Sequence, residues 1–169
     1  MLEQLTALLK GLAYLAAFSG AGSVLARHTL VRGQPECLAL TRLIRVSGAV
    51  LALTATATAL VYMLRLGETL DTDMIRAVLL SPLGAALGLQ AIGGTGLAIF
   101  ANRRLAIVAA ILILLSFGIS GHAATRGIAS SASVLVHVSA AAWWLGGLWT
   151  LLLASRNRAG EAFAELVRA

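Results

Sequence analysis

Apolar residues fill the chain in five long runs that are separated by short polar segments. A helix needs about 20 apolar residues to cross the hydrocarbon layer of a bilayer. The pattern therefore predicts an all-α fold, a polytopic membrane helix bundle of about five transmembrane helices that forms a single domain over residues 1–169. The five predicted spans cover about residues 5–26, 43–66, 82–101, 105–122 and 131–154.

The polar segment between the second and third spans carries helix signals of its own. Thr72 or Asp73 can cap a short helix that continues through Leu80. Ser81 followed by Pro82 is typical of an N-cap and the first position of the next helix. We therefore expect a short interfacial helix that lies along the membrane surface before the third span.

Composition agrees with a lipid environment. Of 169 residues, 59% are hydrophobic and 12% are charged, whereas about a quarter of the residues in an average soluble domain are charged. The net charge of +6 would suggest nucleic acid in a soluble protein. Here the cations lie between apolar runs, so we expect a lipid bilayer as partner and no nucleic acid.

The distribution of Lys and Arg predicts an orientation. Connections and tails on one side of the five spans carry nine of these residues, and the other side carries four. The excess of positive charge marks cytoplasmic segments. We expect a multi-pass protein of a bacterial inner membrane with a periplasmic N-terminus and a cytoplasmic C-terminus. The nine are Arg27, Arg32, Arg42, Arg45, Arg103, Arg104, Arg156, Arg158 and Arg168, and the four are Lys10, Arg65, Arg76 and Arg126.

Two histidines flank one short periplasmic connection. His122 ends the fourth span, and His137 lies about two turns inside the fifth span. A tight turn would place these two helices side by side, so the imidazoles could face each other in the outer leaflet. An ionisable residue at membrane depth usually has a function or a partner. The alternative is a neutral imidazole that only stabilises the bundle.

Methionines on the same side indicate which metal such a site would select. Met63 lies near the outer end of the second span, and Met74 lies on the predicted surface helix. Thioether sulfur prefers Cu(I), and imidazole accepts copper or zinc. The sequence thus predicts a copper site with His122, His137, Met63 and Met74 as candidate ligands, although methionine in an apolar stretch is more often packing filler.

A second pair of soft ligands falls near the first loop, on the opposite face. His28 and the single cysteine, Cys37, could receive a metal that crosses the membrane. Their spacing resembles no known ligand set, which favours an interfacial histidine and an incidental thiol.

The segment that contains His137 resembles a family signature. Residues 137–148 read HVSAAAWWLGGL, which is similar to the signature of the CopD family of bacterial copper-resistance membrane proteins, where a His is followed seven residues later by a Trp in a W-x-G-G context. Trp144 takes the Trp position. The segments SGHA at 120–123 and LLSPLG at 79–84 resemble two further motifs of that family, so the resemblance covers about residues 43–154.

The resemblance implies copper import or homeostasis at the inner membrane. It implies that copper is accepted at the periplasmic face, often beside a periplasmic CopC-type copper carrier, and is transferred across the membrane or to a partner. A chain of about five spans is shorter than the longer members of that family, so the resemblance implies that a homo-oligomer or a partner would complete the pathway.

Two other functions stay open at this point. Paired histidines in a membrane bundle can supply both axial ligands of a b-type haem in an electron-transfer protein. The chain could also be a non-catalytic scaffold subunit whose histidines are structural. No Ser/His/Asp set and no phosphate-binding glycine loop is evident in the sequence, so we expect that the protein is not an enzyme.

Overall fold

A computed structural model describes residues 2–30, 37–66, 72–120 and 127–168 of the chain. Over these residues the protein forms six helices and no strand, as an all-α bundle requires. The helices are α1 (Leu2–Leu30), α2 (Leu38–Leu66), α3 (Thr72–Leu79), α4 (Pro82–Phe100), α5 (Leu105–Ile119) and α7 (Ile128–Arg168).

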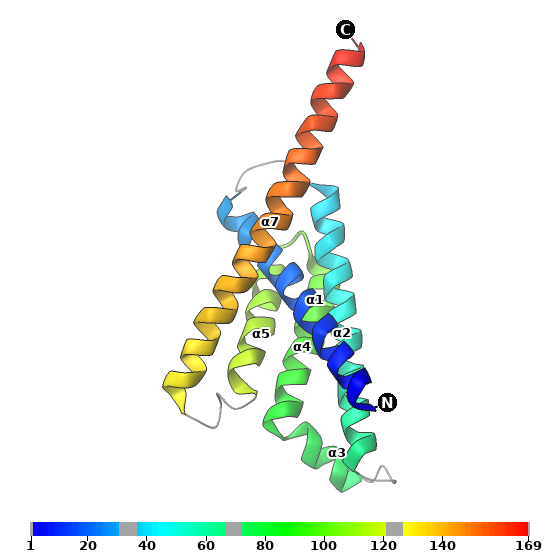
Figure 1. Cartoon of the computed structure of the whole chain (residues 1–169), viewed down its shortest axis with the longest axis vertical. Coiled ribbons are helices and arrows are strands. Elements are labelled where there is room, and N and C mark those ends of the chain that lie inside the picture. Colours follow the sequence, from blue (N-terminus) through cyan, green and yellow to red (C-terminus); the bar gives the residue numbers. More distant parts are fainter. Residues whose placement is uncertain (1, 31–36, 67–71, 121–126, 169) are drawn as a thin grey trace.

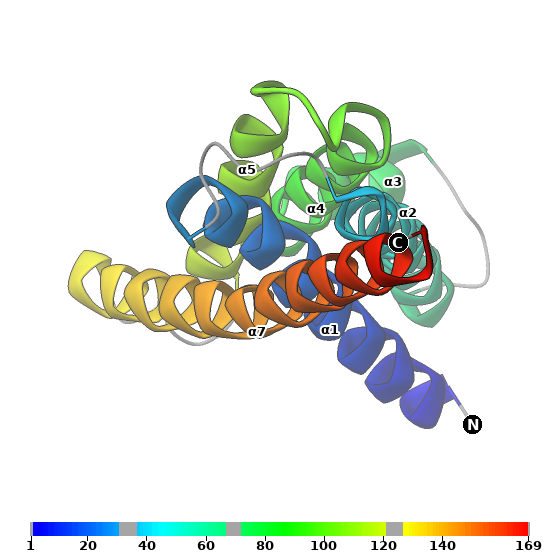
Figure 2. The same ribbon diagram turned by 90° about the horizontal axis from the view of Figure 1, so that it is seen from above.

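The long helices run back and forth between two ends of one bundle (Figure 1). At the upper end of Figure 1, α1 ends, α2 begins, and α4 turns into α5. At the lower end lie the N-terminus, α3, and the start of α7. In chain order α2 packs on α1, α4 on α2, and α5 on α4, and α7 packs mainly on α1. Figure 2 shows α7 lying across one side of this bundle.

Four helices are long and apolar enough to cross a membrane, namely α1, α2, α4 and α7. They identify the chain as a multi-pass membrane protein. The predicted fourth span, 105–122, corresponds to α5, which has 15 residues and ends at Ile119. At 1.5 Å per residue α5 is about 22 Å long, which is shorter than a hydrocarbon layer of about 30 Å.

Other boundaries extend beyond the apolar runs. Helix α2 begins at Leu38, five residues before the predicted span, because Arg42 and Arg45 are good helix formers and do not interrupt it. Helix α7 continues to Arg168 instead of ending near residue 154, and its C-terminal part projects beyond the bundle (Figure 1).

The predicted short helix and the start of the third span are confirmed. Helix α3 ends at Leu79, and Ser81 caps α4 by accepting a hydrogen bond from the Gly84 amide at 3.1 Å. Pro82 occupies the first turn. A methyl group built on Gly84 would overlap the Val78 carbonyl, so this glycine allows α3 to fold tightly against α4.

Small residues let the helices approach closely. A Cβ atom built on Gly48 of α2 would lie 2.5 Å from the Gly94 carbonyl oxygen of α4 and 2.7 Å from the Ala98 amide nitrogen. Without a strong hydrophobic force between helices in lipid, such backbone contacts supply much of the packing energy. The α2–α4 contact therefore fixes how these two helices align.

Helix α5 is held by one polar and one aromatic contact. Gln90 of α4 donates from Nε2 to the Ser116 hydroxyl of α5 at 3.1 Å, and both residues are buried. On another side, Phe117 contacts the rings of Tyr14 and Phe18 of α1, with centroid separations of 5.4 and 5.8 Å. These contacts position the end of α5 that precedes residues 121–126.

Candidate functional site

Helix α7 carries the recognisable motif, and one of its sides faces the bundle. Leu135, Ala142 and Gly146 lie on this inner side. A Cβ atom on Gly118 of α5 would lie 2.7 Å from the Leu135 side chain. Ala142 is fully buried. The positions 135, 142 and 146 recur at helical spacing, which defines a single packed stripe.

The tightest contact of α7 is a backbone crossing with α1. A methyl group on Gly146 would overlap the Gly22 carbonyl, and one on Gly22 would overlap the Ala142 carbonyl. Of the two adjacent glycines of the motif, only Gly146 lies against a neighbouring backbone. At Gly147 a Cβ atom would meet only the Leu30 methyl, at the ordinary contact distance of 3.4 Å.

A hydrogen bond between side chains reinforces the same crossing. Trp143 donates from its indole nitrogen to the Thr29 hydroxyl at 2.9 Å. Sequence reasoning missed both Gly22 and Thr29 as partners of the motif helix. The small pair Ala142 and Gly146, four residues apart, was the signal that marks this side of α7 as an interface.

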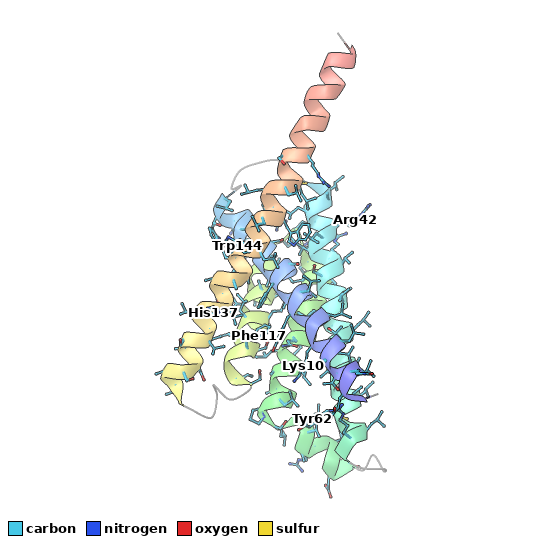
Figure 3. All side chains as sticks on the ribbon, in the orientation of Figure 1. Lys10, Arg42, Tyr62, Phe117, His137 and Trp144 are labelled. Atoms are coloured by element: carbon cyan, nitrogen blue, oxygen red, sulfur yellow. The ribbon has the colours of Figure 1, made fainter. Side chains whose placement is uncertain are left out.

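His137 lies on the opposite side of α7. It follows Leu135 by two residues, which corresponds to a rotation of about 200° around the helix. The His137 side chain is exposed, and within the described part of the chain no hydrogen bond to its imidazole is formed. Trp144, seven residues later, lies on the same open face and is 64% exposed. Figure 3 labels both residues on α7.

The second histidine of the predicted pair, His122, lies outside the described residues. Helix α5 ends and α7 begins at the same lower end of the bundle (Figure 1), as the predicted antiparallel arrangement requires. Because the side of α7 that touches α5 is the Leu135 side, His137 does not face α5 itself. The facing of His122 and His137 stays a prediction.

Of the two candidate methionines, only Met63 has a described side chain, and it does not lie beside His137. Met63 is 8% exposed and lies within α2, whose lower half is separated from His137 by the intervening helices, as the labels of Tyr62 and His137 in Figure 3 show. Met74 belongs to α3 at the lower end, and its side chain is outside the described set. The structure therefore does not bring the Met63 side chain to the open face of α7.

The two residues of the possible second site, His28 and Cys37, each have a backbone carbonyl as a hydrogen-bond partner. The Nδ1 atom of His28 lies 2.8 Å from the Val24 carbonyl oxygen in its own helix. The Cys37 thiol donates to the Leu153 carbonyl oxygen at 3.9 Å. Among the described residues, no three His, Cys, Asp or Glu side chains form a group that could hold a metal ion.

The chain matches no family model, no curated protein and no solved structure. Its function is therefore argued from its own residues.

Proposed function

We propose that the protein is a copper-binding protein of a bacterial inner membrane, which accepts copper at the periplasmic face and passes it across the membrane or to a partner. His137 and His122 are the proposed ligands. The proposed orientation has the N-terminus in the periplasm and the C-terminus in the cytoplasm. A periplasmic CopC-type carrier or a second copy of the chain are the proposed protein partners.

One observation supports the proposal most directly: the imidazole of His137 is exposed and forms no hydrogen bond with any residue that the structure describes. In a membrane segment, a polar side chain that serves only stability is expected to bond within its bundle. His28 behaves in this way, with Nδ1 at 2.8 Å from the Val24 carbonyl oxygen. His137 instead shares an accessible face with Trp144, in the spacing that resembles the CopD signature.

The two remaining ideas have less support. A haem needs two axial ligands and a wide apolar slot between them, whereas the face around His137 is open. A purely structural histidine would be expected to have a bonding partner in the bundle. Copper is therefore the proposed cargo, and the imidazole nitrogen is the proposed ligand atom.

Copper retention by purified protein tests the proposal. Wild type, the single variants His137→Ala and His122→Ala, and the double variant are loaded with Cu(I) under ascorbate or with Cu(II), passed through a desalting column and assayed for metal. We expect wild type to retain copper and the double variant to lose it. His28→Ala is the matched control, because it removes a histidine that is already bonded within α1, and it should retain copper like wild type.

A double variant that elutes as a folded, monodisperse protein and holds as much copper as wild type would contradict the proposal. A Soret band in the visible spectrum of the wild-type protein would favour the haem alternative instead. Copper uptake into proteoliposomes, with and without the two histidines, then separates transfer across the membrane from binding alone.

A further inference from the structure

Exposed arginines gather at the upper end of the bundle. Arg42 and Arg45 are the fifth and eighth residues of α2, and Arg103 and Arg104 lie in the turn between α4 and α5. All four side chains are exposed. We call these four residues the arginine rim. In the sequence the two pairs are almost 60 residues apart, so it is the fold that brings them to the same end of the bundle.

The close contact between α2 and α4 explains this gathering. Gly48 of α2 meets the backbone of Gly94 and Ala98 in α4, and the two helices run in opposite directions (Figure 1). Arg45 precedes Gly48 by three residues, which is about 4.5 Å along the axis. In α4, three residues lead from Ala98 to Ala101, the C-cap of the helix, which is a similar rise along the axis. The start of α2 and the α4–α5 turn therefore stand at the same height.

A fifth arginine at this end already has a hydrogen-bond partner in the bundle. Arg27 of α1 donates to the Ala101 carbonyl oxygen at 2.8 Å. This bond satisfies a terminal carbonyl at the negative end of the α4 dipole. Arg27 is therefore excluded from the arginine rim, because its guanidinium group helps to hold α1 against the end of α4.

The arginine rim has no internal counter-charge in the described part of the chain. None of its four guanidinium groups forms an ion pair or a hydrogen bond with a described residue. The acidic residues whose side chains are described, Glu3 and Asp73, belong to the lower end. Four positive groups with about five donors each are thus available to an anion.

We infer that the arginine rim binds the headgroup of an anionic phospholipid. The rim lies where the membrane-crossing helix α2 begins and where α4 ends. Because the ends of spanning helices leave the hydrocarbon layer, this is the depth at which lipid phosphates are expected. Guanidinium matches a phosphate with two parallel hydrogen bonds, and a basic residue near an anionic membrane surface contributes about 1 kcal/mol. The position of the rim brings it to the lipid phosphates, and its net positive charge favours an anionic lipid over a zwitterionic one.

Native mass spectrometry of the detergent-purified protein tests this inference. The protein is titrated with phosphatidylglycerol or with phosphatidylcholine of the same acyl chains. We expect phosphatidylglycerol to bind more tightly, and we expect removal of each rim guanidinium to raise its apparent Kd about five-fold, which is the equivalent of about 1 kcal/mol. The variants are Arg42→Gln/Arg45→Gln and Arg103→Gln/Arg104→Gln.

The matched control is Arg65→Gln/Arg76→Gln, which removes two exposed arginines from the lower half of the protein. It should leave phosphatidylglycerol binding within two-fold of wild type. Arg103→Lys/Arg104→Lys keeps the charge and should retain more binding than the glutamine pair. The two wild-type titrations still test the inference if a glutamine variant fails to fold.

Three results would overturn the inference. The first is equal binding of the two lipids to wild type. The second is an equal loss of binding in the control pair and in the rim pairs. The third is competition by inorganic phosphate at millimolar concentration that abolishes the preference, since the rim would then be a site for a soluble anion. Each outcome is independent of copper retention, so the two proposals fail separately.

Discussion

The crossing of α1 and α7 yields the sharpest prediction, because a methyl group added at Gly146 meets the backbone of α1, whereas one added at the adjacent Gly147 does not. An alanine methyl at Gly146 would overlap the Gly22 carbonyl and the Ser23 amide. Carbon atoms pack at about 3.5–4.0 Å, so α1 and α7 would have to separate by more than about 1 Å at this point. Overpacking of this kind costs about 1–3 kcal/mol.

The cost at Gly146 should be near the upper limit, because the clash is with backbone atoms of α1 and the packing on α1 is the main contact of α7 with the bundle. Only 11% of its most apolar window is buried, compared with 50% for α1. We expect Gly146→Ala to lower the free energy of unfolding by about 2–3 kcal/mol. Unfolding can be followed by circular dichroism during titration of mixed micelles with SDS.

Gly147→Ala is the matched control for this experiment. It makes the same substitution one residue away, and its new methyl meets only the Leu30 side chain at 3.4 Å. Because alanine is the better helix former, this variant should be neutral or more stable by up to about 1 kcal/mol. If the two variants unfold at the same SDS fraction, the backbone contact between Gly146 and Gly22 does not hold α7 in place.

Two further predictions concern local hydrogen bonds and use the same unfolding measurement. Ser116→Ala should lower stability by about 0.6–1.7 kcal/mol, because it removes the acceptor of the buried Gln90 amide; no loss would mean that Gln90 finds another partner. Ser81→Ala should cost about 1 kcal/mol, because it removes the cap of α4 that accepts from Gly84. A variant with Ser81→Asp, which keeps an N-cap acceptor, should recover most of that loss.

Hydrophobic pattern and cap chemistry were sufficient to predict the helices. Five apolar runs and one capped polar segment correspond to the helices α1 to α5 and α7. Ser81 and Pro82 mark the start of α4 because capping depends only on residues within one turn. Local interactions of this kind can be recognised in a sequence since all of their participants are neighbours in the chain.

Pairing of the helices could not be predicted in the same way. The pattern G-G at 146–147 offers two equal candidates for a close approach, and only the rotation of α7 against α1 selects Gly146. The bond between Arg27 and the Ala101 carbonyl likewise joins residues 74 positions apart. Such choices depend on the rotation and height of whole helices, which are set by the sum of many small contacts.

The orientation of His137 is a direct consequence of that rotation. Because Leu135, Ala142 and Gly146 occupy the inner side of α7, a residue two positions after Leu135 must lie on the outer side. The packed inner side of α7 therefore also fixes the direction of the opposite face, which carries His137. Any ligand that binds beside His137 approaches from the side of α7 that does not contact α1 or α5. This geometry favours capture of copper at the surface of the bundle over a site enclosed within it. If His137 binds copper as proposed, Gly146→Ala, which shifts α7, should change copper retention more than Gly147→Ala does.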